Sequence, residues 1–229
     1  MKKLLGILVL GLLWCNFALA LSLPKDVASG NTYKKSLEGK YKKYGMQVVN
    51  KEDGHPVRAG NQSIRFEVRP GDCGHNEDWN DCDTDRERHE LTGKRMTGGE
   101  WWYSWSIYLP KDFINVYPTK LALGQFHQEK GHVVWMFQNQ SATKAGGYWV
   151  DNGVPGYTKT LNKILTQDEM IEKWNDILVN VKWSKKDDGF FKVWLNNKLV
   201  YYYKGQTKTA AKTYFKFGIY RSFITKWIY

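Results

Sequence analysis

Two short segments of the sequence carry side chains that could move protons in one reaction. The first reads GQFHQ and follows an apolar lead-in, and the second reads YFKFGIY. Side chains alternate faces along a β-strand, so Gln125 and His127 share one face of the first segment. By the same rule Tyr214, Lys216 and Tyr220 share one face of the second. The opposite faces are apolar, so the sequence predicts two strands that present polar, proton-handling groups opposite a core.

Arginine, glutamine, histidine and tyrosine together suit β-elimination in a uronic-acid polymer. The C5 proton of a uronate becomes acidic only when the charge of its carboxylate is neutralised, which arginine, glutamine or protonated histidine can do. A base then removes the C5 proton, and an acid protonates the leaving O4. His127 can be the base because the pKa of histidine is near neutral. A tyrosine can be the acid, or the base if a neighbouring cation lowers its pKa.

Arginine-rich segments supply the third element in two alternative places. One is the pair Arg65 and Arg69 in the alternating run SIRFEVRP. The other is the pair Arg86 and Arg88 in the segment RERHEL. The residue pattern alone leaves both pairs open as the group that neutralises a carboxylate.

The elements that must position these residues are short strands. Helical periodicity is nearly absent, and alternating runs end at Gly, Asn or Pro, which is typical of a β-sandwich. Asn196-Asn197 lies between two alternating runs and predicts a hairpin turn, and residues 167–174 predict a short helix. The expected strands lie near residues 46–49, 64–69, 101–110, 121–128, 132–140, 174–184, 189–205 and 214–222.

The first 20 residues have the pattern of a secretory signal peptide. Two lysines precede an apolar run, and Ala18-Leu19-Ala20 provides small residues for cleavage. The run is short for a membrane span, and Cys15 leaves a lipoprotein as the second alternative. We therefore expect a signal peptide over 1–20, one domain over 21–229, a secreted or periplasmic location and no stable membrane insertion.

Cys73 and Cys82 remain after removal of the predicted signal peptide. An even number of cysteines in an exported chain favours a disulfide between them. The acidic loop around them has Asn76, Asp78, Asn80 and Glu87 at spacings found in calcium loops, but Asp81 stands where the sharp turn requires glycine. We expect no cofactor and no metal, with calcium as the alternative.

The formal net charge of +11 favours a polyanionic partner. An exported protein meets acidic polysaccharides before it meets nucleic acid, so we expect an anionic polysaccharide and no nucleic acid. Aromatic residues make up 15% of the chain, including 11 Trp and 14 Tyr, a composition that suits a surface for stacking on sugars as well as a core.

Taken together, these segments resemble the jelly-roll polysaccharide lyases, a group that holds alginate lyases, glucuronan lyases and heparin lyase I. The alginate-lyase pattern has an Arg-x-Glu, a Gln-x-His and a YFKAGVY segment. Here Arg88-His89-Glu90, Gln125-Phe126-His127 and YFKFGIY occur in the same order. WWYSWSIYLP and DGFFKVWLNNKLV resemble the glucuronan-lyase-like branch. The resemblance covers roughly residues 60–222.

This resemblance implies an all-β, concanavalin A-like jelly-roll sandwich with a concave substrate cleft, acting as a monomer. Gln125 and Arg88 would hold the carboxylate, His127 would neutralise it or act as base, and Tyr220 would be the acid or acid/base. The residues expected to bind substrate are Arg65, Glu90, Tyr214, Lys216 and Arg221. Arg221 replaces the asparagine of the alginate-lyase pattern, which argues against alginate as the substrate.

Other functions on the same fold are a lectin-like module that binds sugars without cleaving them, and a glycoside hydrolase. The lectin-like module does not need a proton donor, whereas this sequence combines Gln125, His127 and Tyr220. The hydrolase needs two carboxylates flanking the bond, and no Glu-x-Asp-x-x-Glu strand is present. The residues therefore favour a secreted lyase acting on a glucuronan-like or alginate-like polymer, with the lectin-like module as the alternative.

Overall fold

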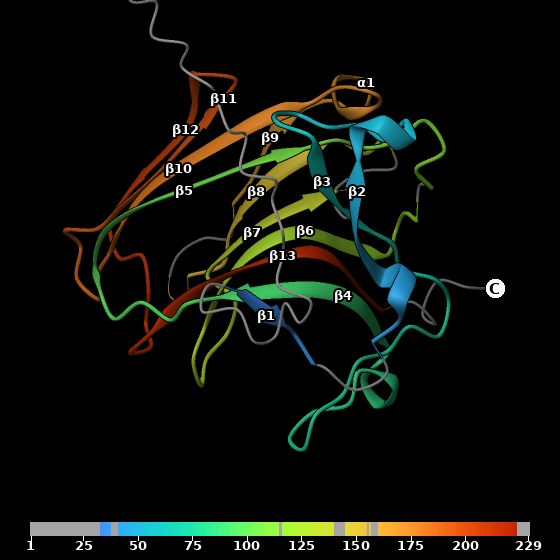
Figure 1. Ribbon diagram of the computed structural model, residues 1–229. Helices are drawn as coiled ribbons and strands as arrows, with labels where there is room; N and C mark the ends of the chain where they lie inside the picture. Colours follow the sequence, from blue (N-terminus) through green and yellow to red (C-terminus); the bar gives the residue numbers. More distant parts are fainter. Residues whose placement is uncertain are drawn as a thin grey trace, which may run out of the picture.

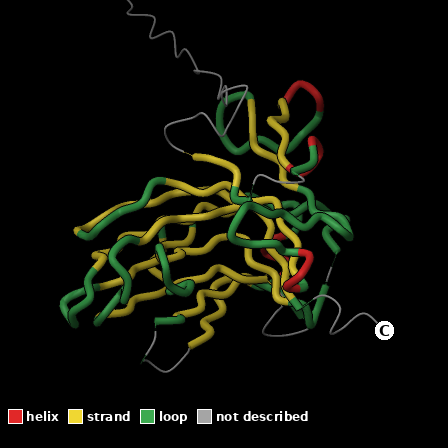
Figure 2. Tube along the Cα trace, turned by 90° about the horizontal axis from the view of Figure 1, so that it is seen from below, coloured by secondary structure: helices red, strands yellow, loops and turns green. Residues whose placement is uncertain are grey.

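The computed structural model describes residues 33–37, 41–114, 116–139, 145–154, 156 and 160–223. The predicted signal peptide, residues 1–20, lies outside these described residues and stays a prediction. Strands make up most of the described chain, and the helical segments are short turns at its periphery (Figure 2).

The larger of two facing sheets has seven strands among the described residues. Their spatial order is β1-β4-β13-β6-β7-β8-β9, with antiparallel neighbours throughout. The strands are β1 (Tyr33–Lys35), β4 (Arg86–Gly93), β6 (Lys120–Gln128), β7 (Trp135–Asn139), β8 (Tyr148–Asn152), β9 (Thr160–Leu165) and β13 (Thr213–Ser222). β13 therefore lies between β4 and β6, although it is the last described strand in the chain.

The smaller sheet has four described strands in the order β12-β11-β10-β5. A separate two-stranded sheet pairs β2 with β3. The strands are β2 (Met46–Asn50), β3 (Gln62–Phe66), β5 (Gly99–Ile107), β10 (Asn175–Trp183), β11 (Phe190–Leu195) and β12 (Lys198–Lys204). Figure 1 shows the smaller sheet stacked on the larger one, with β2 and β3 beside the stack at one end. This layering confirms the predicted β-sandwich.

Aromatic side chains fill the space between the two sheets. Phe126 on β6 is fully buried and contacts Phe215 on β13 with ring centroids 4.8 Å apart. Trp135 on β7 stacks on Phe191 on β11 at 4.0 Å, which joins the two layers directly. Phe126 and Phe215 thus point into the core, as the alternating pattern predicts. The polar face of the GQFHQ strand must then be the face of the larger sheet turned away from the smaller one, which we call its outer face.

The turns agree with the sequence pattern in most places. Asn196 and Asn197 join β11 to β12 with φ of 48° and 69°, which confirms the predicted hairpin. The helix α1 (Gln167–Met170) begins at a capping box formed by Thr166 and Glu169. It ends earlier than predicted because residues 170–172 leave the helix and exchange backbone hydrogen bonds with Leu109.

The larger sheet is curved. In Figure 1, β4 and β13 arch toward the smaller sheet, so the outer face is the concave side. The polar side chains of β4, β6 and β13 lie on this side, where the predicted substrate cleft would lie. In the described parts of the chain, no helix has the length and apolar character needed to cross a membrane.

Candidate active site

A buried carboxylate, Glu90 on β4, is the centre of the outer face. Its Oε1 accepts a hydrogen bond from Gln125 Nε2 at 2.6 Å, and its Oε2 accepts one from Arg88 at 3.2 Å and lies 2.7 Å from Lys216 Nζ. All four side chains are at most 9% exposed. The strand registers explain the meeting, because Lys216 on β13 lies opposite Gln125 on β6. The structure therefore brings Arg88, Glu90, Gln125 and Lys216 together, and their role in a site stays a prediction.

Gly218 allows β13 to approach β4 closely at this point. It lies opposite Glu90 and has φ of +129°, a conformation that side-chain-bearing residues rarely adopt. A Cβ added to it would lie 2.3 Å from the His89 carbonyl oxygen and 2.9 Å from the Glu90 Cα. The glycine of the YFKFGIY segment is thus required by the backbone contact that brings Lys216 and Glu90 together.

Asp81 fixes the guanidinium of Arg88. Arg88 Nε and one terminal nitrogen donate to the two oxygens of Asp81 at 2.5 and 2.7 Å, and Asp81 is fully buried. Asp81 belongs to the loop closed by the disulfide between Cys73 and Cys82, which confirms the predicted pairing. Two carboxylates, Asp81 and Glu90, therefore balance two cations in this buried cluster.

Burial and neighbouring charges shift the pKa values of Glu90 and Lys216 in opposite directions. Burial alone would raise the pKa of Glu90, but Lys216 and Arg88 outweigh it and hold that pKa below its ordinary value. Burial lowers the pKa of Lys216, and the neighbouring Glu90 opposes this shift. Glu90 therefore stays ionised and serves as the anchor on which Lys216, Arg88 and Gln125 are oriented.

Tyr220 lies at one end of this buried cluster, between two guanidinium groups. Arg86 Nε donates to the Tyr220 hydroxyl oxygen at 2.8 Å, and Arg88 lies over the ring with its central carbon 4.4 Å from the centroid. The register places Tyr220 opposite Arg88. Arginine has no acceptor, so the hydroxyl proton of Tyr220 is not used in its bond to Arg86.

Tyr214 and His127 form a second proton-handling pair at the other end of the cluster. The two residues lie opposite each other in the β13–β6 register, with the Tyr214 hydroxyl 3.2 Å from His127 Nδ1. His127 Nδ1 is also 2.8 Å from the Gln128 carbonyl oxygen. Because a carbonyl only accepts, this bond favours the tautomer that carries its proton on Nδ1 and leaves Nε2 with a free lone pair.

The pKa values of this pair are both shifted by burial. Burial, with help from Lys216, lowers the pKa of the His127 imidazole. Burial also raises the pKa of the Tyr214 hydroxyl, although Arg95 lies over its ring at 4.8 Å and acts in the opposite direction. At neutral pH the site thus holds an uncharged imidazole and a protonated phenol side by side.

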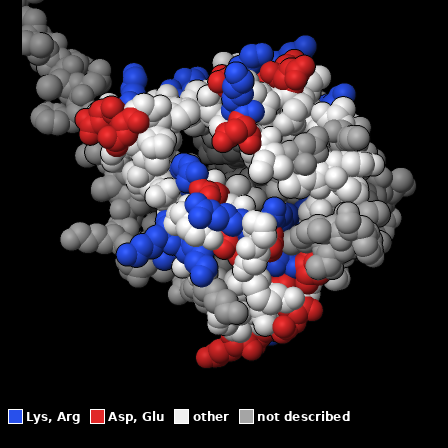
Figure 3. All heavy atoms as spheres, turned by 90° about the vertical axis from the view of Figure 1, so that its right-hand side faces the viewer, with Lys and Arg blue, Asp and Glu red and all other residues white. Residues whose placement is uncertain are grey.

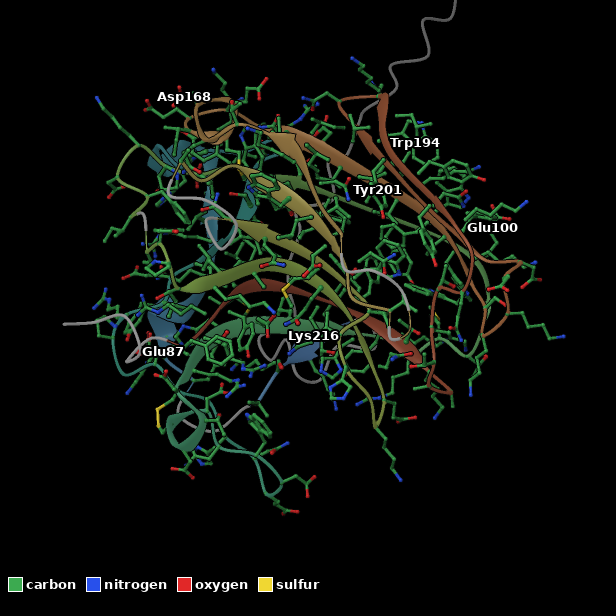
Figure 4. All side chains as sticks on the ribbon, turned by 180° about the vertical axis from the view of Figure 1, so that it is seen from behind. Glu87, Glu100, Asp168, Trp194, Tyr201 and Lys216 are labelled. Atoms are coloured by element: carbon green, nitrogen blue, oxygen red, sulfur yellow. A yellow bond between two sulfur atoms is a disulfide. The ribbon has the colours of Figure 1, made fainter. Side chains whose placement is uncertain are left out.

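The two ends of the site are separated along the strands. Tyr220 lies opposite Ala122, whereas Tyr214 lies opposite His127. Ala122 and His127 are five residue steps apart along β6, which corresponds to about 16 Å at the usual rise of a strand. The buried cluster lies between them, and Figure 4 shows Lys216 near the middle of the larger sheet.

Two of the residues predicted to bind substrate do not join this cluster. Arg221 lies opposite Glu87 in the register and pairs with it on the other face of β4 and β13. Arg65 is on β3, in the two-stranded sheet, and is held by Glu67 and Gln47. Figure 3 views that end of the molecule, where Lys and Arg side chains lie directly beside Asp and Glu. These placements do not fit a role for Arg65 or Arg221 at the cluster.

Sequence reasoning named Arg86 only as an alternative beside Arg88, and it gave Asp81 no role at the site. Arg86 precedes Arg88 by two residues, so its position on the same face as Arg88 could have been read from the strand period. Its contact with Tyr220 could not, because that depends on the pairing of β13 with β4. Asp81 gave no signal, since an acidic residue in an acidic loop does not reveal its partner.

The acidic loop is held by its own hydrogen bonds. Asn76 and Asn80 accept from the backbone of Asp78 and Cys82, and Glu87 accepts from Gly71 and pairs with Arg221. Within the ranges that the structure describes, no group of three or more His, Cys, Asp or Glu is placed to hold a metal ion. The expectation that no metal or cofactor takes part stays a prediction.

Comparisons with known proteins agree with the fold and with the sequence resemblance. A sequence profile described as "Polysaccharide lyase" matches residues 30–229. An endo-β-1,4-glucuronan lyase from the fungus Trichoderma reesei has a similar structure, with a TM-score of 0.53, 16% identity and coverage of 82% of each chain. The alginate lyase PA1167 from Pseudomonas aeruginosa gives a TM-score of 0.51 at 12% identity, covering 83% of this chain and 88% of its own. No curated protein matches the sequence.

Proposed function

The chain belongs to the polysaccharide lyase family, and from this membership we propose that it cleaves a uronic-acid-containing polysaccharide by β-elimination. In this reaction the C5–H bond and the C4–O4 bond break, and a C4=C5 double bond forms. The site must therefore accept one proton, return one proton to O4 and balance the charge that develops on the carboxylate. The outer face of the larger sheet offers a group for each task.

The observation that carries the proposal is the environment of Tyr220. Its hydroxyl oxygen accepts from Arg86, which leaves the hydroxyl proton free for the leaving O4. Arg86 and the guanidinium of Arg88 over the ring both stabilise negative charge on the phenol oxygen once the proton is given away. Tyr220 is therefore the general acid, and the same groups would let it act as the base when the C5 hydrogen and O4 lie on one side of the sugar.

His127 is an alternative base, and its partner acid would be Tyr214, whose hydroxyl lies 3.2 Å from His127 Nδ1, because Tyr220 lies about 16 Å away along the strands. His127 Nε2 has a free lone pair in the tautomer fixed by Gln128. Because burial lowers the pKa of His127, the imidazole is uncharged and able to accept a proton at neutral pH. Tyr214 lies against the same imidazole and would steady its orientation.

Neutralisation of the substrate carboxylate falls to groups whose charge or hydrogen bonds are not already used. Asp81 and Glu90 balance the charges of Arg88 and Lys216. Arg86 has no carboxylate within ion-pair distance in the described chain; besides Tyr220 it donates to the Thr84 carbonyl. We therefore assign carboxylate neutralisation to Arg86 and to the second N–H of the Gln125 amide, whose first N–H donates to Glu90, with Arg88 as the residue that supports Tyr220.

The substrate class follows from charge and relatives. The protein has a net charge of +11, and the two similar structures are a glucuronan lyase and an alginate lyase by name. We propose a glucuronan-like or alginate-like polymer, bound by an exported form of the chain. The disulfide between Cys73 and Cys82 supports export, because such bonds persist in oxidising compartments.

The test is the absorbance of the unsaturated uronate that β-elimination creates. The protein is incubated with glucuronan, alginate and heparin-type polymers, and product is followed in the ultraviolet. We expect product from at least one polymer and a loss of at least about 100-fold in kcat for Tyr220→Phe, with polymer binding retained.

The outcomes separate the alternatives. A protein that binds these polymers and forms no unsaturated product would be the lectin-like module. Full activity of Tyr220→Phe would remove Tyr220 from its role. As a matched control, Tyr108→Phe removes a hydroxyl from a tyrosine that packs against Trp174 outside the candidate site, and it should leave kcat unchanged.

A further inference from the structure

The outer face of the smaller sheet carries a group of exposed aromatic side chains that takes no part in the site above. Trp102 is 57% exposed and Tyr202 is 55% exposed. Trp194 stacks on Trp102 with ring centroids 5.6 Å apart and planes at 28°. Figure 4 shows Trp194 on the side of this sheet away from the larger one, whereas Tyr201 points between the sheets. We call Trp102, Lys192, Trp194 and Tyr202 the aromatic strip.

Strand registers place the strip across the whole sheet. Trp102 on β5 lies opposite Asn180 on β10, Asn180 lies opposite Lys192 on β11, and Lys192 lies opposite Tyr202 on β12. Three interstrand steps of about 4.8 Å separate Trp102 from Tyr202, or about 14 Å in all. The strip is thus a narrow row perpendicular to the strands, with an aromatic ring near each end and a cation between them.

Packing within the fold does not account for this exposure. The neighbouring positions of the same strands, such as Tyr103, Val193 and Tyr201, already supply the core. Contiguous exposed aromatic groups on a soluble domain usually mark a binding surface. Asn180 lies between Trp102 and Lys192 in the row and is only 3% exposed. The strip is therefore continuous rather than a set of isolated side chains.

Lys192 is the charged member of the strip, and Glu100 on the same face of β5 accepts a hydrogen bond from Asn180 Nδ2 at 2.8 Å. Lys192 Nζ lies over the rings of Phe190 and Tyr202, at 4.8 and 5.5 Å from their centroids. Among the residues that the structure describes, neither Lys192 nor the nearby Lys204 has a carboxylate within ion-pair distance. The acidic Asp176 of the same face is already paired with Arg58 at 2.6 Å.

We propose that the aromatic strip is a second binding site for an acidic polysaccharide chain, separate from the candidate active site. The faces of aromatic rings are electronegative and attract the C–H faces of pyranose rings, while Lys192 would pair with a uronate carboxylate between them. The site lies on the outer face of the opposite sheet, so one polymer could be held here while another stretch is cleaved. The acidic class of the ligand rests on the proposed function.

A second copy of the chain fits the strip less well than a sugar polymer. Lysine is depleted at the centre of protein–protein interfaces, and here Lys192 occupies the middle of the row. A stable dimer also needs about 800 Å² from each partner, whereas the strip is one row of side chains wide. A narrow row of rings with a central cation matches an extended polysaccharide that carries one carboxylate on each uronate unit.

The test measures binding without cleavage, in the Tyr220→Phe background. Affinity electrophoresis in gels containing glucuronan, alginate or a neutral β-glucan compares Trp102→Ala, Tyr202→Ala and Lys192→Ala with matched controls. Trp101→Ala removes an indole that is 38% exposed and points to the opposite side of β5. Lys111→Ala removes an exposed cation from a turn.

We expect Trp102→Ala and Tyr202→Ala each to weaken retention by an acidic polymer about tenfold. Lys192→Ala should weaken retention and reduce its dependence on salt. Both controls should behave as the Tyr220→Phe parent. In the active background, the strip variants should raise KM for long polymer, with kcat and turnover of short oligosaccharides unchanged.

Three results would overturn the proposal. One is unchanged retention in folded Trp102→Ala and Tyr202→Ala proteins. Another is equal loss of retention for the neutral glucan, which would remove the role of Lys192. The third is a change of sedimentation from dimer to monomer in the strip variants, which would make the strip a self-association surface. Absence of any lyase product refutes the proposed function instead, since retention is read without catalysis.

Discussion

Replacement of Lys216 by methionine tests whether the buried cluster is balanced by charge as its geometry implies. Lys216 is 6% exposed at its side chain and lies 2.7 Å from Glu90, which is 1% exposed. Methionine keeps most of the length and apolar character of the lysine stem. The change therefore removes a charge and a hydrogen bond without opening a large cavity, and it leaves Glu90 with Arg88 and Gln125 only.

The unfolding free energy of Lys216→Met should be much lower than that of the parent, because Glu90 stays buried without its lysine partner. Removal of one partner from a buried ion pair costs about 3–5 kcal/mol, most of it from the charge left without compensation. This is a substantial fraction of the roughly 5–15 kcal/mol by which a domain is stable. Adding Glu90→Gln to Lys216→Met should recover part of the loss, because the remaining charge is then removed as well.

The dependence of stability on pH should reverse its sign. In the natural sequence the pKa of Glu90 is held below its ordinary value, so its contribution to stability is present above the unfolded pKa of about 4.3 and is lost as pH falls through the folded pKa. In Lys216→Met, burial should raise the folded pKa of Glu90 above 4.3. Its contribution is then present at low pH and is lost as pH rises through the folded pKa.

Urea unfolding at a series of pH values between 4 and 8 measures both effects. Lys212→Met is the matched control, since Lys212 pairs with Glu129 at the surface with 42% and 35% exposure. A surface pair contributes about 0–1 kcal/mol, so this variant should stay close to the parent. An unfolding free energy and pH slope in Lys216→Met equal to those of the parent would refute the reasoning.

Other changes separate catalysis from stability. Arg86→Gln should lower kcat about 100-fold, and Arg86→Lys should recover only part of it; unchanged product formation would contradict carboxylate neutralisation by Arg86. Because burial lowers the pKa of His127, activity should fall only as pH drops below about 6.5, so an acid limb of kcat/KM above that value would exclude His127 as the base. Trp135→Ala should reduce the unfolding free energy by about 3–5 kcal/mol, read from urea midpoints. The double variant Cys73→Ser, Cys82→Ser should reduce the unfolding free energy by about 2–3 kcal/mol. As a check, its urea midpoint should equal that of the parent protein after reduction of the disulfide.

Alternation in the sequence was sufficient to predict the faces of β6 and β13, whereas β1, β4, β8 and β9 were not among the expected strands. Alternation placed Gln125 with His127 and Tyr214 with Lys216, and the structure puts each pair on the outer face of the larger sheet. The same rule predicted that Phe215 faces the core, where it contacts Phe126. Faces are local properties of a strand, so one sequence contains the information needed.

Partners across strands could not be predicted in the same way. Alternation places Arg221 on the other face from Tyr220, but nothing local to β13 shows that it lies against Glu87. The bidentate contact of Arg88 with Asp81 depends on a loop folding back over β4. Both arrangements are set by pairings between segments far apart in the chain, which residue periodicity does not encode.

The position of β13 also bears on how the protein is made. β13 is the last described strand to leave the ribosome, yet it lies between β4 and β6 in the middle of the larger sheet. Until it arrives, β4 and β6 each present an unpaired edge, and such edges pair with other chains. The seven-stranded sheet and the site that it carries therefore form in one late step, when β13 inserts between them. The nascent chain has no partial activity before that step, and its open edges are the surfaces that a chaperone would need to cover.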